Sequence, residues 1–266
     1  MAFSENSKNG VLYMTSDKLA VCHAFTTRLG GVSTGTFSSL NLSVSMGDIP
    51  ENVSENYRRI CCALGICKDD LVFSNQVHRD DVRIVTKEDR HELFTDVPFE
   101  ADALVTAQAD VPLIIFTADC TPILLFDPIC KVIAAVHSGW RGTALAIVAK
   151  TVRVMCEKFG CRPENIAAAV GPCICVDCYE TGDGVPNALR AVLGDDTDLC
   201  RIVINGKAHT DLKRANMLIL QNAGILPENI DISEECTCCS HDKYWSHRYT
   251  HGVRGSQASI ICMKGN

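Results

Sequence analysis

Short apolar runs rich in β-branched residues alternate with longer amphipathic stretches along nearly the whole chain, and this alternation constrains the fold more than any other feature. Such runs are typical of buried strands, whereas apolar residues at three- and four-residue spacing predict helices. Strands are expected at residues 21–27, 71–77, 82–85, 103–106, 113–117, 123–126, 132–136, 166–170, 202–204, 230–232 and 259–263. Helices are expected at residues 52–64, 144–159, 183–193 and 211–222.

This alternation predicts one α/β domain. Three of the expected helices are followed by a glycine that can end a helix in the left-handed conformation: Gly65, Gly160 and Gly224. With 266 residues, of which 47% are hydrophobic, the chain can bury a large core. Neither a Pro- or Ser-rich linker nor an internal repeat interrupts the pattern. We therefore expect a single domain over residues 1–266, with the order of its strands left open.

The charge and hydropathy of the chain argue against some partners. The formal net charge of -7 is spread out and no basic run occurs, so binding of nucleic acid through phosphate contacts is not expected. Apolar stretches such as residues 111–116 and 123–126 are too short to cross a bilayer. The N-terminus has no basic region followed by an apolar one, which argues against a secretory signal. We expect a cytoplasmic protein that does not bind membranes.

The chain contains 16 cysteines. Because export is not expected, reduced thiols are favoured over a disulfide framework, and most are interpreted as small buried side chains. Two dense groups of thiols stand out: Cys173, Cys175 and Cys178, and Cys236, Cys238 and Cys239. Such groups can hold Zn²⁺ or an iron–sulfur cluster. We interpret them as lacking the paired C-x-x-C layout of a zinc ribbon and as matching no ferredoxin run, so a second metal site is not favoured.

Three residues of metal-binding type each stand at the polar end of an apolar run: His78, Cys120 and His137. Taken singly, each is more simply explained as a solvated or core side chain. Together they stand where neighbouring strands of one sheet are expected to end, and the carboxyl ends of such strands face a common crevice. Two imidazoles and one thiolate suit Zn²⁺ and leave its fourth position open for water or substrate. The sequence therefore predicts one zinc ion per chain at a catalytic site.

Asp119, directly before the thiol, is a further candidate for catalysis. A carboxylate at this position can orient a ligand histidine or accept a proton. The alternative is an aspartate that forms a turn ahead of Pro122.

Three arginines are candidates for binding an anion. Arg28 precedes Gly30 and Gly31, whose backbone amides can approach an oxyanion closely. Arg141 lies near the start of the helix expected to follow it, where the helix dipole favours a phosphate or carboxylate. Arg248 lies in a polar and aromatic segment. The alternative for each is an arginine that is exposed or paired with an acid at the surface.

Several motifs follow one another in a recognisable order. They are His23-Ala24-Phe25-Thr26-Thr27-Arg28-Leu29-Gly30-Gly31-Val32-Ser33, Leu40-Asn41-Leu42, Gln76-Val77-His78, Ala101-Asp102-Ala103-Leu104-Val105-Thr106, Thr117-Ala118-Asp119-Cys120, Ala135-Val136-His137-Ser138-Gly139-Trp140-Arg141-Gly142-Thr143, Gly171-Pro172 and Cys236-Thr237. In this order the chain resembles the YfiH-type laccase-domain family, long labelled polyphenol oxidase and now regarded as purine nucleoside phosphorylases. The resemblance runs from about residue 11 to 263.

The resemblance implies a fold, a cofactor and an activity. The fold is a single α/β domain with central mixed β-layers flanked by helices, an αββα-like sandwich. The cofactor is zinc, with copper possible, held by His78, Cys120 and His137. The activity is phosphorolysis of adenosine, inosine and methylthioadenosine, with adenosine deamination in addition. Arg28 and Arg248 match positions used around the substrate, and Asn41 in its matching segment is assigned with them. The partners implied are a nucleoside and phosphate, for a monomer or weak homodimer.

Other functions stay open at this point. Copper-dependent phenol oxidation is disfavoured because several coppers need many histidines, and only 8 occur here, with no H-x-H pair. A cysteine hydrolase with Cys120 as its nucleophile is a third possibility, with a peptidoglycan precursor as substrate. The non-enzymatic alternative is a metal-storage or interaction module built on the two groups of cysteines.

Overall fold

The computed structural model describes residues 3–43 and 45–265, and it contains two large sheets and one small one. The first large sheet has the order β1-β2-β3-β13-β6, and its neighbouring strands are antiparallel. Its strands are β1 (Phe3–Lys8), β2 (Val11–Ser16), β3 (Cys22–Thr26), β13 (Gln257–Cys262) and β6 (Leu113–Thr117). A separate hairpin joins β10 (Arg201–Ile204) to β11 (Lys207–Thr210).

The second large sheet is mixed and has the order β12-β9-β7-β8-β5-β4. Its outer pairs, β12 with β9 and β4 with β5, are parallel, and its central pairs are antiparallel. Its strands are β12 (Ile230–Ile232), β9 (Ala167–Val170), β7 (Thr121–Asp127), β8 (Val132–Ser138), β5 (Ala103–Thr106) and β4 (Val82–Ile84). Most of these strands are buried on both faces, which explains their continuous apolar runs.

The two sheets pack face to face. Leu113 and Ile115 of β6 lie in the same core cluster as Leu124 of β7 and Ile133 of β8. Because side chains alternate along a strand, the neighbours of these residues point outward and pack against helices. Ile114, for example, belongs to a separate cluster on the other face of β6.

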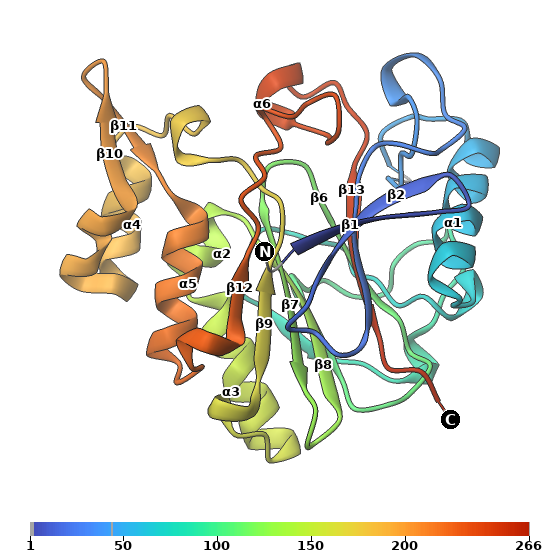
Figure 1. Cartoon of the computed structure of the whole chain (residues 1–266), viewed down its shortest axis with the longest axis horizontal. Helices are drawn as coiled ribbons and strands as arrows, with labels where there is room; N and C mark the ends of the chain where they lie inside the picture. Colours follow the sequence, from blue (N-terminus) through green and yellow to red (C-terminus); the bar gives the residue numbers. More distant parts are fainter. Residues whose placement is uncertain (1–2, 44, 266) are drawn as a thin grey trace.

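Helices cover both outer faces of the sandwich (Figure 1). The first sheet is covered by α1 (Pro50–Leu64). The second is covered by three helices: α3 (Ile147–Phe159), α4 (Gly184–Leu193) and α5 (Leu212–Asn222). Two short helices complete the fold, α2 (Trp140–Ala144) and α6 (His247–Thr250). The αββα sandwich that the resemblance implied is therefore confirmed.

Two predicted elements are wrong. Residues 71–77 form no strand, because the segment makes single bridges to two different partners, Val72 to Leu113 and Asn75 to Glu100. The helix expected at residues 144–159 is two helices, α2 and α3, because Ala146 has a φ of 56° and interrupts the helical backbone. Strands β1, β2 and β11 were not predicted. No helix in the described parts of the chain is long and apolar enough to cross a membrane.

Candidate metal centre

The pairing of β7 with β8 brings two of the expected ligands together. Because the strands are antiparallel, the start of β7 lies beside the end of β8, and Pro122 pairs with His137. Cys120 comes immediately before β7, at its amino end. Cys120 also follows β6, as expected, but β6 belongs to the first sheet and His78 follows no strand, so the expectation that all three residues end neighbouring strands of one sheet is wrong. The antiparallel register of β7 and β8 still places Cys120 next to His137.

His78 lies on the segment that crosses from one sheet to the other. The Gln76 side chain fixes this segment to β6, because its Nε2 donates to the Phe116 carbonyl (2.8 Å) and its Oε1 accepts from the Phe116 amide (2.7 Å). His78 has a φ of 59°, in the left-handed region that non-glycine residues seldom adopt. Its amide donates to Oδ1 of Asp102 at 3.0 Å. These bonds hold a strained backbone that points His78 at the other two candidate ligands.

The structure brings His78, Cys120 and His137 into one cluster. One possible ligand atom from each lies within 4.8 Å of the others, and Cys120 Sγ is 4.0 Å from His78 Nε2. A side chain on Gly139 would crowd this cluster, because a Cβ there would lie 3.2 Å from both Cys120 Sγ and His78 Cδ2. The glycine thus leaves space beside the ligands.

Asp102 organises the centre, and sequence reasoning did not single it out for this role. Its buried carboxylate accepts a 2.7 Å hydrogen bond from Nδ1 of His137. It also accepts from the amides of Val77 (3.2 Å), His78 (3.0 Å) and Arg79 (2.8 Å). Since Nδ1 of His137 is the donor, Nε2 is free to bind a metal. Two imidazoles and a thiolate, one imidazole backed by a carboxylate, are a donor set that fits Zn²⁺.

Cys120 and His137 alter each other's protonation. Burial raises the pKa of the Cys120 thiol, but the charge of His137 and hydrogen bonds with both histidines outweigh it and lower this pKa to about 6. Burial lowers the pKa of His137, whereas the Cys120 thiolate and Asp102 raise it to about 9. Between these values the metal-free pair is a thiolate and an imidazolium. Cys120 is therefore in the ionised form that metals bind.

Asp119 does not take the role of orienting a histidine, which belongs to Asp102. Its Oδ1 accepts from Oγ1 of Thr237 at 2.6 Å, and its Oδ2 accepts from the backbone amide of Arg248 at 2.6 Å. Asp119 has a φ of 89° in the turn between β6 and β7. It links the loop that carries Cys120 to the loop that contains Thr237 and to α6.

A cavity of about 330 Å³ opens beside the centre, within the size range of small-molecule sites. Its apolar walls include Phe73 and Phe116, and Arg254 supplies a positive charge. The described residues that line it are Ser43, Ser45, Met46, Phe73, Ser74, Asn75, Gln76, His78, Val97, Phe116, Thr117, Ala118, Cys120, His137, Arg254 and Ser256. The three metal-ligand candidates thus share one cavity with an arginine.

The three arginines expected to bind an anion lie outside the lining of this cavity. Arg28 donates from Nε and Nη2 to the Ser38 carbonyl (3.0 and 2.6 Å) and from Nη1 to the His241 carbonyl (2.8 Å). Arg248 donates to the carbonyls of Cys178 and Glu180, both at 3.0 Å. These two guanidinium groups therefore tie loops together.

Arg141 is exposed, with its Cζ 4.4 Å from the ring centre of Trp140. It belongs to α2, which is one short turn rather than the start of the long helix. None of the three expected arginines is among the lining residues of the cavity named above.

Gly30, Gly31 and Asn41 also serve the packing of loops. A Cβ on Gly30 would lie 2.1 Å from the Gly10 carbonyl oxygen, and one on Gly31 would lie 2.1 Å from that of Ser39. Both glycines therefore permit close contact between backbones. Asn41 is fully buried, and its Nδ2 donates to Asp48 at 2.9 Å.

Arg254 is the cavity residue that sequence reasoning missed. It is half-buried, and its Nη1 donates to the Gly255 carbonyl (2.9 Å) and to Oγ of Ser256 (2.8 Å). Burial lowers the pKa of Arg254, and the charges of Asp119 and Cys120 oppose that effect. No local pattern distinguishes it, because its neighbours Asp119 and Cys120 are far away in the sequence.

Comparisons with known proteins identify the family to which the chain belongs. A sequence model of the family described as "Multi-copper polyphenol oxidoreductase laccase" matches residues 22–264. A purine nucleoside phosphorylase of Deinococcus radiodurans is 41% identical over 254 residues, which are 95% of this chain and 93% of the relative. Adenosine deaminase RL5, from an unknown prokaryotic organism, is 36% identical over 85% of this chain and 87% of its own.

A solved structure shows the same fold. The crystal structure of YlmD from Geobacillus stearothermophilus superposes with a TM-score of 0.93 and 32% identity, covering 99% of each chain. Since the family model covers most of the sequence and the relatives match over nearly their full lengths, the resemblance seen in the motifs is confirmed. The chain belongs to the YfiH-type family described as multi-copper polyphenol oxidoreductase laccase.

Proposed function

We propose that this protein is a zinc-dependent purine nucleoside phosphorylase that acts on adenosine, inosine and methylthioadenosine and also deaminates adenosine. The observation that carries the proposal is the convergence of His78, Cys120 and His137 beside a cavity that also contains Arg254. Relatives named as purine nucleoside phosphorylase and as adenosine deaminase support the two activities.

The donor set determines which metal is expected. Two imidazoles and a thiolate suit Zn²⁺, and Cu²⁺ can bind the same donors. When bound, zinc supplies Lewis acidity and a coordinated water of lowered pKa. Asp102 holds His137 through Nδ1 and so fixes which nitrogen faces the ion.

Phosphorolysis needs an anion site next to the sugar. A phosphate oxygen bonds to C1′ while the bond from C1′ to the base breaks, and the base leaves with the bonding electrons and is protonated. In this proposal Arg254 binds the phosphate, which is supported by its half-buried guanidinium and by its position in the wall of the same cavity as Cys120. Phe73 and Phe116 offer aromatic walls against which a purine can pack.

Product analysis tests both activities in zinc-loaded protein. Inosine with phosphate is expected to give hypoxanthine and ribose 1-phosphate, and inosine without phosphate is expected to give no hypoxanthine. Adenosine is expected to give adenine only when phosphate is present. Without phosphate, adenosine is expected to be deaminated to inosine. Hypoxanthine release at the same rate with and without phosphate would refute phosphorolysis. Failure to form inosine from adenosine would refute deamination.

A second candidate is a cysteine hydrolase. In this reading Cys120 is the nucleophile, His137 is its base and Asp102 is the acid that orients the base. The low pKa of Cys120 is compatible with this role too. Removal of the metal separates the two functions. Full activity after chelation, abolished by alkylation of Cys120, would favour the hydrolase, whereas activity that disappears with zinc and returns with it would favour the phosphorylase.

A further inference from the structure

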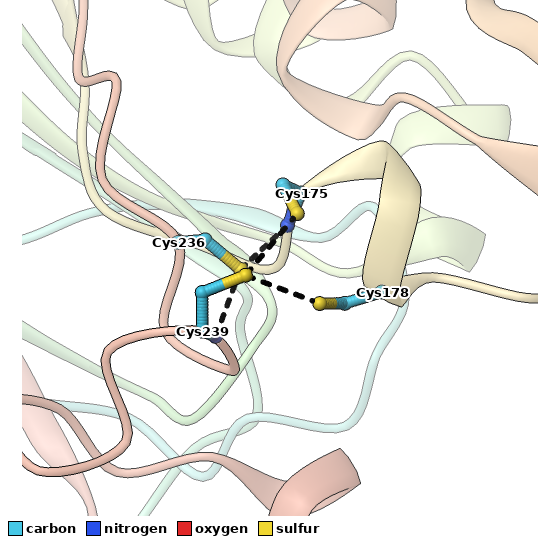
Figure 2. A group of neighbouring side chains, drawn as sticks. All are labelled: Cys175, Cys178, Cys236 and Cys239. Atoms are coloured by element: carbon cyan, nitrogen blue, oxygen red, sulfur yellow. Dashed lines mark hydrogen bonds between the residues drawn. The ribbon is translucent and has the colours of Figure 1, made fainter.

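Four thiols from two distant segments meet outside the candidate metal centre. Cys175 and Cys178 precede α4, Cys236 and Cys239 follow β12, and their side chains point toward one another (Figure 2). The four sulfurs lie within 4.8 Å of one another, with Cys178 Sγ 3.4 Å and Cys175 Sγ 3.9 Å from Cys239 Sγ. We call these four residues the thiol tetrad.

The spacing within the tetrad fits a single tetrahedral ion. Zinc–sulfur bonds of about 2.3 Å place the four sulfurs of a tetrahedron about 3.8 Å apart. An iron–sulfur cluster interposes several irons and sulfides between its thiolates and spreads them farther. The distances from Cys239 to Cys175 and Cys178 agree with one ion at the middle.

The sequence of the tetrad is that of a structural zinc site. Cys175-Val176-Asp177-Cys178 and Cys236-Thr237-Cys238-Cys239 are two C-x-x-C pairs, so the interpretation that the paired layout is lacking is wrong. The extra thiols Cys173 and Cys238 obscured the pairs. Cys173 is not part of the tetrad, since it is buried and its Sγ accepts from Oγ1 of Thr121 at 3.4 Å.

Two backbone amides donate to the sulfur of Cys236, as amides do to the thiolate ligands of metal sites. The amides of Cys175 and Cys239 both donate to Cys236 Sγ, at 3.2 and 3.3 Å. Amide donors stabilise a sulfur that carries negative charge. The two segments are also joined by a backbone bridge between Cys173 and Cys236. The tetrad is therefore held in place by the fold on both sides.

We propose that Cys175, Cys178, Cys236 and Cys239 bind a second zinc ion, as a closed structural site separate from the candidate metal centre. Four thiolates fill the tetrahedron and leave no position for substrate. The ion joins the two segments, and hydrogen bonds link both of them to Asp119, the residue before Cys120, one directly and one through Arg248. Thr237, between two of the ligands, donates to Asp119, and the Cys178 carbonyl accepts from Arg248. The second zinc thus positions the loop next to Cys120.

Metal analysis of the full-length protein tests the proposal directly. Wild-type protein is expected to contain about two zinc ions per chain, one for each four-coordinate site. The Cys178→Ser/Cys239→Ser variant is expected to lose one of them. Cys238→Ser is the matched control, since it removes a thiol from the same loop but outside the tetrad, and it is expected to keep both ions.

The His78→Ala/Cys120→Ala variant separates this proposal from the proposed function. It is expected to lose the ion of the candidate centre and to keep that of the tetrad. One zinc per chain in the wild type, lost only when His78 and Cys120 are replaced, would overturn the proposal. So would iron in the tetrad, or a mass two hydrogens lower that reveals a disulfide between tetrad cysteines.

Wild-type protein supplies a second test that does not depend on the folding of a variant. Alkylation of the native protein, read out by peptide mapping, is expected to spare the tetrad thiols until a strong chelator removes zinc. The exposed thiols Cys62 and Cys67 are expected to react with or without the chelator. Cys239 is exposed too. If the extent of its alkylation is the same before and after chelation, no ion is bound by the tetrad.

Discussion

At the scale of single residues, one buried carboxylate determines the geometry of the candidate centre. Asp102 accepts hydrogen bonds from His137 Nδ1 and from three consecutive amides that begin at Val77. It therefore fixes one candidate ligand, His137, through its ring and another, His78, through its backbone. Asp119, which the sequence favoured, lies next to Cys120 in the chain but has its hydrogen bonds elsewhere.

Replacement of Asp102 by asparagine is expected to weaken zinc binding at the centre by about 10- to 100-fold, because the charge behind His137 is lost. Competition with a chromophoric chelator measures this affinity. Asp119→Asn is the matched control and is expected to weaken binding much less, because Asp119 bonds to Thr237 and the Arg248 amide and to none of the candidate ligands. Both variants are made in the Cys178→Ser/Cys239→Ser protein, so that only the candidate centre is titrated. Equal losses in both variants would contradict the role of Asp102.

The pH dependence of Cys120 alkylation in metal-free protein follows from its pKa. Since that pKa is lowered to about 6, the thiolate is present above this pH and is lost as the pH falls through it. The rate of iodoacetamide labelling of the Cys120 peptide is expected to have its midpoint there. In His137→Gln the midpoint is expected to move up toward the ordinary thiol value. A wild-type midpoint near 9 would show that His137 does not stabilise the thiolate.

At the scale of elements, a buried polar network ties α5 to the end of β8 and to α2. Asn216 of α5 accepts from Oγ of Ser138 at 2.8 Å, and its Nδ2 donates to Oγ1 of Thr143 at 3.2 Å and to the Leu212 carbonyl at 2.9 Å. Ser138 directly follows the candidate ligand His137. The helix layer thus helps to hold the strand end that carries His137.

Asn216→Ala is expected to lower the free energy of unfolding by about 1–3 kcal/mol, because buried hydroxyl groups lose a partner. Urea denaturation measures the change. Asn222→Ala on the exposed side of the same helix is the control, with an expected change within about 0.5 kcal/mol. If the two variants lose the same stability, the network does not contribute as described.

At the scale of the whole molecule, the sequence predicted the central strands whose residues are nearly all buried. The strands from β5 to β9 have continuous apolar runs and were all expected. Strand β1 was missed because it is a polar strand at the edge of its sheet, with most side chains exposed. The break at Ala146 was missed because neither glycine nor proline marks it.

The candidate ligands could be predicted because each is of a metal-binding residue type at the end of an apolar run. Asp102 and Arg254 could not be assigned in the same way, because their roles depend on segments that meet only in the folded chain. Arg28 and Arg248 were expected near the substrate from anion chemistry and from the resemblance, and that role stays a prediction; in the structure both donate to backbone carbonyls. Residue type predicts which chemistry is possible, and pairing between distant segments determines where it occurs.

The most direct test of the central claim is a titration of zinc into metal-free protein, with phosphate-dependent hypoxanthine release from inosine as the readout. The rate is expected to rise in proportion to occupancy of the site formed by His78, Cys120 and His137, and to stay at background in His78→Ala at every zinc concentration. A full rate in metal-free protein, or an unchanged rate in His78→Ala, would contradict the claim that this centre performs the reaction.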